Sequence, residues 1–397
     1  HTIMERNHPR IQSLTSIRAF AALLVVASHG LHLSLPAAWW SKVILTTINL
    51  GFTGVDLFFI LSGYILSYVY LNETDLKNFD RNSFWKSRFA RVYPVYLFSF
   101  LLQVPFVVRY VIAMPDRLHQ AIRAIVTLGV NLALLQAWDV VLRLRWNYPS
   151  WTLSVEAFFY FLFPFLGIWF WKKTEKRNYF LWILACFLTI VAPSTLFCAL
   201  GFNGAFNDHN FPAMFVRFSP LMRLPEFGLG LLLMRFHQKL TADRKDTEWA
   251  ANAFFWGGVG GALAGFTFLD SIRPLLLYCG MFDLCFAAII LGAALSKGFL
   301  ASILSFGPLV LLGEASYGIY ILQAPVGDWW IVILTAIFRD QKGMMGKTSF
   351  QPSSFFYYLT ALILASLLTY WFIEKPLREK IRSIRFHFGP KVPNSVH

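Results

Sequence analysis

Long apolar runs alternate with short polar breaks along the whole chain. The apolar runs lie at 14–34, 50–70, 92–113, 121–137, 152–171, 179–200, 217–235, 250–269, 275–296, 304–337 and 354–373. A run of roughly 20 apolar residues is long enough for a helix to cross a bilayer. The pattern therefore predicts an all-α polytopic membrane protein.

The polar breaks predict how these runs cross the bilayer. Cations gather at 81–91, 172–177, 235–245 and 375–385, and short loops rich in Lys and Arg lie on the cytoplasmic side. Counting from a cytoplasmic N-terminus and counting back from the basic tail disagree by one crossing between Arg91 and Trp151. We therefore expect 121–137, the shortest run, to be re-entrant or interfacial. The prediction is about ten transmembrane helices with both termini cytoplasmic.

Further expectations concern the run 304–337 and the two ends of the chain. Pro325 interrupts the run 304–337 and should kink or end the helix near that point, which leaves Asp328–Trp330 at the outer interface. We expect a cytoplasmic N-terminal segment at 1–13, in which residues 1–3 before Met4 are a cloning remnant. The membrane domain then covers 14–374, and a basic cytoplasmic tail covers 375–397.

Composition agrees with a membrane protein and argues against nucleic-acid binding. Of the 397 residues, 57% are hydrophobic and 14% are charged, whereas soluble domains carry roughly 25% charged residues. The formal net charge is +14, but the cations lie in the polar breaks, where the positive-inside rule explains them. The four cysteines have no metal-type spacing, and we expect no metal site.

Arg18 and His29 lie within the first apolar run. Eleven residues of α-helix rise about 16 Å and turn through roughly 1100°, or three turns plus about 20°. The two side chains therefore share one stripe, near opposite sides of the membrane. Ionisable residues at membrane depth are costly and mark functional sites. His32 competes with His29, and snorkelling of Arg18 to the headgroups is the structural alternative.

Other ionisable residues are predicted to lie at the same two membrane depths as Arg18 and His29. The predicted topology places Asp56 and Glu156 in the outer halves of their helices with His29, and Arg88 and Arg91 on the inner side with Arg18. Asp56 as a helix cap and Glu156 as an arginine partner are the structural alternatives. We expect Arg223 and Glu226, three residues apart, to pair with each other.

These residues form two tiers, with the arginines on the inner side and His29, Asp56 and Glu156 further out. Two such tiers suit transfer from an anionic cytoplasmic donor to an outward-facing acceptor through one tunnel. Arginines hold phosphates by charge-assisted hydrogen bonds. An imidazole can take a proton from a hydroxyl nucleophile, and a carboxylate can fix its tautomer. An acyl-coenzyme A fits the distance, because its pantetheine arm separates the phosphates from the thioester.

Several sequence blocks carry a family resemblance. The first run, with Arg18 and His29 separated by ten residues, resembles the Arg-x10-His helix of acyltransferase family 3. The most specific match is Gly51-Phe-Thr-Gly-Val-Asp-Leu-Phe-Phe-Ile-Leu-Ser-Gly-Tyr64. Further matches follow in family order: Arg88-Phe-Ala-Arg-Val-Tyr-Pro94, Trp151-Thr-Leu-Ser-Val-Glu156, Arg223-Leu-Pro-Glu-Phe-Gly-Leu-Gly230, Gly313-Glu-Ala-Ser-Tyr-Gly-Ile-Tyr320 and Glu374-Lys-Pro376.

The resemblance implies an O-acyltransferase of the bacterial inner membrane. Such an enzyme takes acyl groups, commonly acetyl, from cytoplasmic acetyl-CoA and modifies carbohydrate acceptors of the cell surface. The resemblance assigns His29, Asp56 and Glu156 to catalysis and Arg18, Arg88 and Arg91 to the donor. Gln323 stands where many relatives have a histidine. No fused esterase-like domain is expected after the last span, so polysaccharide-assembly proteins are expected partners alongside the bilayer.

Alternatives remain at this stage. His29 acts as a general base in one mechanism and carries the acyl group itself in another. The same residues would also suit a proton-coupled transporter or flippase, although no internal repeat is visible. The third alternative is a regulatory subunit without catalytic activity, and the departure from the family pattern at Gln323 is the observation that suggests it.

Overall fold

The computed structural model describes residues 11–31, 36, 38–71, 79–139, 146–174, 178–201, 211–243, 246–268, 280–338 and 352–384. Every regular element among them is a helix, so the all-α prediction is confirmed. His32, Cys279, residues 1–10 and residues 385–397 lie outside the described residues, as does much of the expected N-terminal segment and tail.

The N-terminal half holds long helices and short 3₁₀ or π turns. Its elements are α1 (Gln12–Gly30), α2 (Trp39–Asn49), η1 (Gly51–Thr53), α3 (Gly54–Tyr70), α5 (Arg81–Ala113), α6 (Arg117–Leu132), η2 (Gln136–Trp138), η3 (Tyr148–Ser150), α7 (Trp151–Leu162), η4 (Phe163–Gly167), α8 (Ile168–Thr174) and α9 (Tyr179–Ala199). The Asp80 carboxylate begins α5 because it accepts hydrogen bonds from the backbone N–H groups of Asn82 and Ser83, which satisfies donors that the helix leaves unpaired.

The C-terminal half continues the bundle. Its elements are α10 (Phe211–Phe218), α11 (Pro220–Asp243), α12 (Glu248–Phe268), α14 (Asp283–Leu295), α15 (Phe299–Leu304), α16 (Gly307–Glu314), α17 (Ser316–Phe338), α19 (Pro352–Thr369), η6 (Tyr370–Glu374) and α20 (Lys375–Ser383). The run 304–337 breaks at Ala315, between α16 and α17. It does not end at Pro325, which lies inside α17, because contacts from other elements replace the bond that the proline removes.

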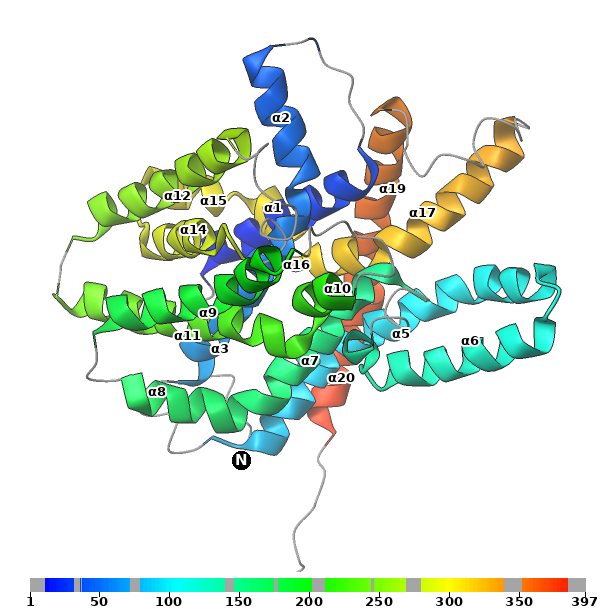
Figure 1. Cartoon of the computed structure of the whole chain (residues 1–397), viewed down its shortest axis with the longest axis horizontal. Coiled ribbons are helices and arrows are strands. Elements are labelled where there is room, and N and C mark those ends of the chain that lie inside the picture. Colours follow the sequence, from blue (N-terminus) through cyan, green and yellow to red (C-terminus); the bar gives the residue numbers. More distant parts are fainter. Residues whose placement is uncertain are drawn as a thin grey trace, which may run out of the picture.

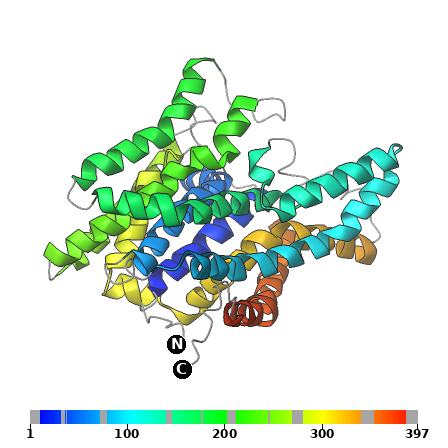
Figure 2. The same cartoon turned by 90° about the horizontal axis from the view of Figure 1, so that it is seen from below.

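Seven helices within the described residues are long and apolar enough to cross a membrane. They span 12–30, 51–70, 81–113, 148–174, 179–199, 316–337 and 354–383, and α14 is a shorter apolar helix. The protein is thus a multi-pass membrane protein, while the count of about ten spans stays a prediction. Helix α6, in the run expected not to cross, is not among the seven. With the ends of α5 and α17 it extends to one side of the bundle (Figures 1 and 2).

Helix α1 lies in the middle of the bundle (Figures 1 and 2) and belongs to two hydrophobic cores. Leu14, Ile17 and Val25 pack into the core that α3, α7, α11 and α14 share. Ala22 and Val26 pack into the core built from α5, α17 and α19. Since the seam between the two cores follows α1, polar residues on that helix can face space between them.

Glycines set how closely the helices around α1 approach each other. A Cβ on Gly51 would lie 2.2 Å from the Leu24 carbonyl oxygen of α1. A Cβ on Gly63 of α3 would lie 2.1 Å from the Phe227 carbonyl oxygen of α11. Both positions belong to the second-run block of the sequence. Small residues let membrane helices pack backbone against backbone, and Gly63 serves this close packing.

Candidate functional site

Arg18, Arg88 and Arg91 line one cavity, which we call the arginine cavity. Arg18 comes from α1, while Arg88 and Arg91 lie three residues apart on α5 and so share one face of that helix. The remaining lining includes Glu156, Tyr160, Tyr317 and Tyr320. The predicted grouping of the three arginines is therefore confirmed.

Polar contacts hold the wall of the arginine cavity in place. The Tyr160 hydroxyl donates to Glu156 Oε2 at 3.1 Å, and the Trp85 indole N–H donates to the Tyr160 carbonyl at 2.9 Å. Arg88 Nη2 donates to the Tyr70 hydroxyl at 3.3 Å. The carboxylates of Glu156, Glu314 and Glu374 interact electrostatically with Arg18 and Arg91. Arg18 and Arg91 thus each interact with all three carboxylates, whereas Arg88 interacts with Glu156.

The arginine cavity is narrow. Its volume is about 80 Å³, which is room for a few water molecules. A donor with a phosphorylated head needs the cavity to widen.

His29 lines a second, wider cavity, which we call the histidine cavity. Its volume is about 670 Å³. Its polar lining comes from α5, α6, the segment before α7, α17 and α19, and includes Gln103, Gln120, Arg123, Thr127, Trp146, Tyr148, Gln323, Asp328 and Tyr358. The His29 side chain is exposed to this space. Asp328 accepts a hydrogen bond from Gln103 at 2.9 Å within the cavity, and its position at the outer interface stays a prediction.

Two neighbours set the orientation of the His29 ring. His29 Nδ1 lies 2.9 Å from Gln323 Oε1. The Tyr148 ring packs edge-on against the imidazole, with ring centroids 5.1 Å apart and an interplanar angle of 83°. Gln323 is therefore a neighbour of His29, although the sequence marked it only as a departure from the family pattern.

A partition of aromatic side chains separates the two cavities, which share no lining residue. Tyr320 lines the arginine cavity, packs against Phe58 with ring centroids 6.0 Å apart, and donates its hydroxyl to the Pro149 carbonyl at 3.2 Å. Tyr148, the residue before Pro149, lines the histidine cavity. The two cavities are thus distinct in this structure, and a single tunnel joining them stays a prediction.

The predicted tiers grouped Glu156 with His29, but the structure does not bring these two residues together. Glu156 lines the arginine cavity. There its carboxylate interacts electrostatically with Arg18, Arg91 and Arg88 and accepts a hydrogen bond from Tyr160. The depth argument failed because it placed residues along the membrane normal and ignored which side of each helix they occupy.

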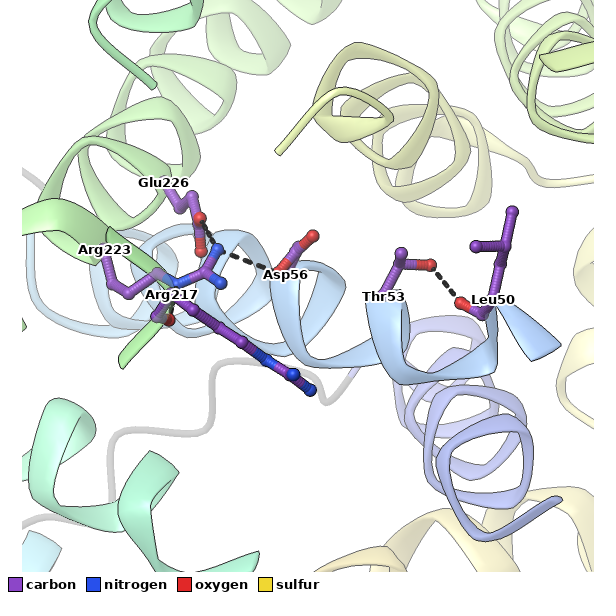
Figure 3. Close-up of polar contacts among 6 residues, drawn as sticks. All are labelled: Leu50, Thr53, Asp56, Arg217, Arg223 and Glu226. Carbon is purple, nitrogen blue, oxygen red and sulfur yellow. Dashed lines mark hydrogen bonds and ion pairs between the residues drawn. The ribbon is translucent and has the colours of Figure 1, made fainter. Parts of the chain in front are cut away.

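Asp56 belongs to a third group, a buried charge cluster of Asp56, Arg223, Glu226 and Asp283. Arg223 Nη1 lies 3.1 Å from Asp56 Oδ1 and 2.5 Å from Glu226 Oε1. Figure 3 shows the Arg223 guanidinium between the two carboxylates, on helices α3 and α11. The predicted pairing of Arg223 with Glu226 is confirmed, whereas Asp56 is not brought together with His29. Catalytic roles for Asp56 and Glu156 stay predictions.

Tyrosines are the site residues that sequence reasoning missed. Tyr160, Tyr317 and Tyr320 all line the arginine cavity, and each stands in or directly after a family block. The sequence pattern assigns these tyrosines no role. Within the described part of the chain, no group of three His, Cys, Asp or Glu side chains could hold a metal ion.

Comparison with known proteins points to one family. The chain is 29% identical over 235 residues to "Acyltransferase MdmB" of Streptomyces mycarofaciens, covering 56% of this chain and 57% of that protein. It is 24% identical over 385 residues to "O-acetyltransferase OatA" of Staphylococcus aureus, covering 93% of this chain and 57% of the relative. For "Putative peptidoglycan O-acetyltransferase YrhL" of Bacillus subtilis the identity is 26% over 394 residues, covering 94% and 56%.

The chain thus spans somewhat more than half the length of these relatives. No solved structure matches. The model of the acyltransferase domain that defines the family matches residues 11–374, which is nearly the whole chain. The protein therefore belongs to acyltransferase family 3.

Proposed function

We propose that the protein is an O-acyltransferase of the bacterial inner membrane, with both termini in the cytoplasm. It moves an acyl group, acetyl in the first instance, from cytoplasmic acyl-CoA to a hydroxyl group of a cell-surface carbohydrate or its lipid-linked precursor. The observation that carries the proposal is the placement of a three-arginine cavity and a histidine cavity along one central helix, α1. The names of the two O-acetyltransferase relatives support it.

The arginine cavity is the proposed donor site. Arg18, Arg88 and Arg91 would bind coenzyme A phosphates, because guanidinium groups form charge-assisted and often bidentate hydrogen bonds with phosphate oxygens. The pantetheine arm would then extend along α1 toward His29, over a rise of about 16 Å. This path requires Tyr320 and Tyr148 to move apart, since they now divide the two cavities.

The histidine cavity is the proposed acceptor site. Its amides, aromatic rings and carboxylate are groups that can hydrogen-bond sugar hydroxyls and pack on sugar rings. His29 would take the proton from one acceptor hydroxyl while that oxygen attacks the thioester carbonyl carbon. A C–O bond forms, the C–S bond breaks, and the proton passes from His29 to the departing coenzyme A thiolate.

The test compares strains that carry the intact gene, His29→Ala or His119→Ala at matched protein levels. His119 is an exposed histidine beside Asp116 on α6 and lines neither cavity, so it controls for loss of an imidazole. NMR of surface polysaccharide should show acetyl groups in the intact and His119→Ala strains and none in the His29→Ala strain. Equal acetylation in all three would remove His29 from the mechanism.

Donor binding is tested separately on purified protein. Coenzyme A should stabilise both the intact protein and His29→Ala against thermal unfolding, since His29 lies outside the arginine cavity. Incubation with labelled acetyl-CoA alone then distinguishes the two mechanisms. Direct transfer leaves the protein unlabelled, whereas a covalent route through His29 leaves an acetyl group on it.

A further inference from the structure

Both ends of the Gln323 side-chain amide are engaged. Gln323 is 2% exposed and lies on α17. Its Nε2 donates to the Tyr320 carbonyl oxygen at 2.8 Å, and its Oε1 lies 2.9 Å from His29 Nδ1. A buried amide held at both ends has one orientation available to it.

These contacts determine where the proton of His29 resides. A backbone carbonyl only accepts hydrogen bonds, so the NH₂ end of the amide must face Tyr320. The oxygen end therefore faces His29, and it too only accepts. The hydrogen bond exists only when His29 Nδ1 carries the proton, which in a neutral ring leaves the lone pair on Nε2.

The local backbone of α17 explains why Gln323 is held firmly. Pro325 has no N–H, so the Ile321 carbonyl lacks its usual partner four residues later. Asn147 Nδ2 donates to that carbonyl at 2.9 Å. The Tyr358 hydroxyl donates to the carbonyl of Gln323 itself at 2.8 Å. The Ile321 carbonyl that Pro325 leaves without a backbone donor thus holds the segment that precedes α7 beside Gln323.

The same anchor brings the second neighbour of His29 into place. Tyr148 follows Asn147 directly, and its ring packs edge-on against the imidazole. The hydrogen bond that Gln323 accepts from His29 and the ring contact from Tyr148 therefore both depend on the α17 backbone around Pro325.

We propose that Gln323 is a positioning residue that holds His29 as the Nδ1–H tautomer and leaves Nε2 as the nitrogen that accepts the acceptor's proton. The catalytic part of this inference rests on the proposed acyltransferase function, and the tautomer itself does not. Gln323 performs the orienting task that a carboxylate performs in hydrolase triads, but it adds no charge to the site.

The first test reads the tautomer without any activity. ¹⁵N NMR of the full-length protein with labelled histidine distinguishes protonated from unprotonated ring nitrogens, and His29→Gln identifies the His29 signals. The intact protein should show a protonated Nδ1 and an unprotonated Nε2. Gln323→Glu should keep this pattern, since a protonated carboxyl can donate its O–H to the Tyr320 carbonyl and accept from His29 Nδ1 with its other oxygen. Gln323→Leu should lose it.

Asn252→Leu is the matched control, because it removes an amide whose Nδ2 donates to the Glu248 carbonyl at 2.9 Å on α12, away from both cavities. It should leave the His29 signals unchanged. A protonated Nε2 in the intact protein, or the same tautomer in Gln323→Leu, would overturn the inference.

The second test reads the consequence for transfer. Polysaccharide acetylation in the Gln323→Leu strain should fall by about 10-fold or more, because a wrong histidine tautomer costs activity even when the fold is intact. Gln323→Glu should restore much of it, and coenzyme A binding should not change in either variant. Full acetylation in Gln323→Leu would overturn the positioning role. Absence of acetylation in the intact strain, together with the expected tautomer, would instead count against the proposed function.

Discussion

Arg88 differs from its two neighbours in how the fold uses its charge. Arg18 and Arg91 interact with the carboxylates of Glu156, Glu314 and Glu374, so removing either would leave buried negative charge unbalanced. The hydrogen bonds of Arg88 go to the hydroxyls of Tyr70 and Ser87. Arg88 is therefore the arginine whose substitution tests donor binding most cleanly.

We predict that Arg88→Gln weakens coenzyme A binding by about 10-fold to 100-fold, since a hydrogen bond to a charged group contributes roughly 1.5–3 kcal/mol. Isothermal titration of the purified protein with coenzyme A measures this. Arg81→Gln is the control, because Arg81 lies over the Phe165 ring and lines neither cavity. Equal affinity in the two variants would contradict a donor role for the arginine cavity.

The buried charge cluster makes a contrasting pair of predictions about stability. Neither carboxylate oxygen of Asp283 has a hydrogen-bond partner among the described residues, and Glu226 and Asp56 lie close enough to repel it. Asp283→Asn should therefore raise the melting temperature in detergent. Arg223→Met should lower stability by about 3–5 kcal/mol, because it leaves buried carboxylates unpaired. Thermal unfolding of both variants measures this, and a fall in both would argue against electrostatic strain at Asp283.

At the scale of elements, the junction of α12 with the turn between α14 and α15 depends on one carboxylate. Glu248 Oε2 accepts hydrogen bonds from the backbone N–H groups of Lys297 at 2.7 Å and Gly298 at 3.0 Å. A Cβ at position 298 would lie 2.8 Å from Glu248 Oε1, so a larger residue there would displace this carboxylate. These backbone donors lower the pKa of Glu248 below its ordinary value of about 4.5.

This shift fixes the sign of a pH dependence. A carboxylate whose pKa is lowered by folding stabilises the fold above its ordinary pKa, and the contribution is lost as the pH falls through the lower folded value. Glu248→Gln should therefore melt at a lower temperature than the intact protein at pH 7, and the gap should narrow below about pH 4.5. Melting curves from pH 7 to pH 3.5 measure it, and a constant gap would rule out the charge of Glu248 as the cause.

The helices also show how much of the structure the apolar pattern predicted. Apolar length located the helices, and the exclusion of the 121–137 run from the spans agrees with α6. Pro325 was expected to kink or end the helix, yet α17 continues through it and the run breaks at Ala315, since Asn147 and Tyr358 support the backbone of α17 around the proline. Periodicity within one segment contains no information about such contacts from other segments.

At the scale of the whole molecule, the division into two cavities is the main functional feature. The arginine cavity lies at one part of α1 and the histidine cavity at another, with Tyr320, Phe58 and Tyr148 between them. A closed partition would keep water near the acceptor from reaching the donor thioester until the acceptor is in place.

We predict that Tyr320→Ala joins the cavities and raises hydrolysis of acetyl-CoA in the absence of any carbohydrate. Release of free coenzyme A by the purified protein, followed with a thiol reagent, measures this. Tyr320→Phe is the matched control, because it keeps the ring and loses only the hydrogen bond to Pro149. If hydrolysis by Tyr320→Ala equals that of Tyr320→Phe, the ring does not separate the two sites.

The sequence by itself determined the helical membrane architecture and the placement of Arg88 and Arg91 on one face of one helix. Each of these depends on hydrophobic length or on helical periodicity within short segments, which local sequence encodes. Only the tertiary structure decided that Glu156 faces the arginines, that Asp56 pairs with Arg223 and that Gln323 meets His29. These contacts join residues far apart in the chain, and the rotation and packing of whole helices select them.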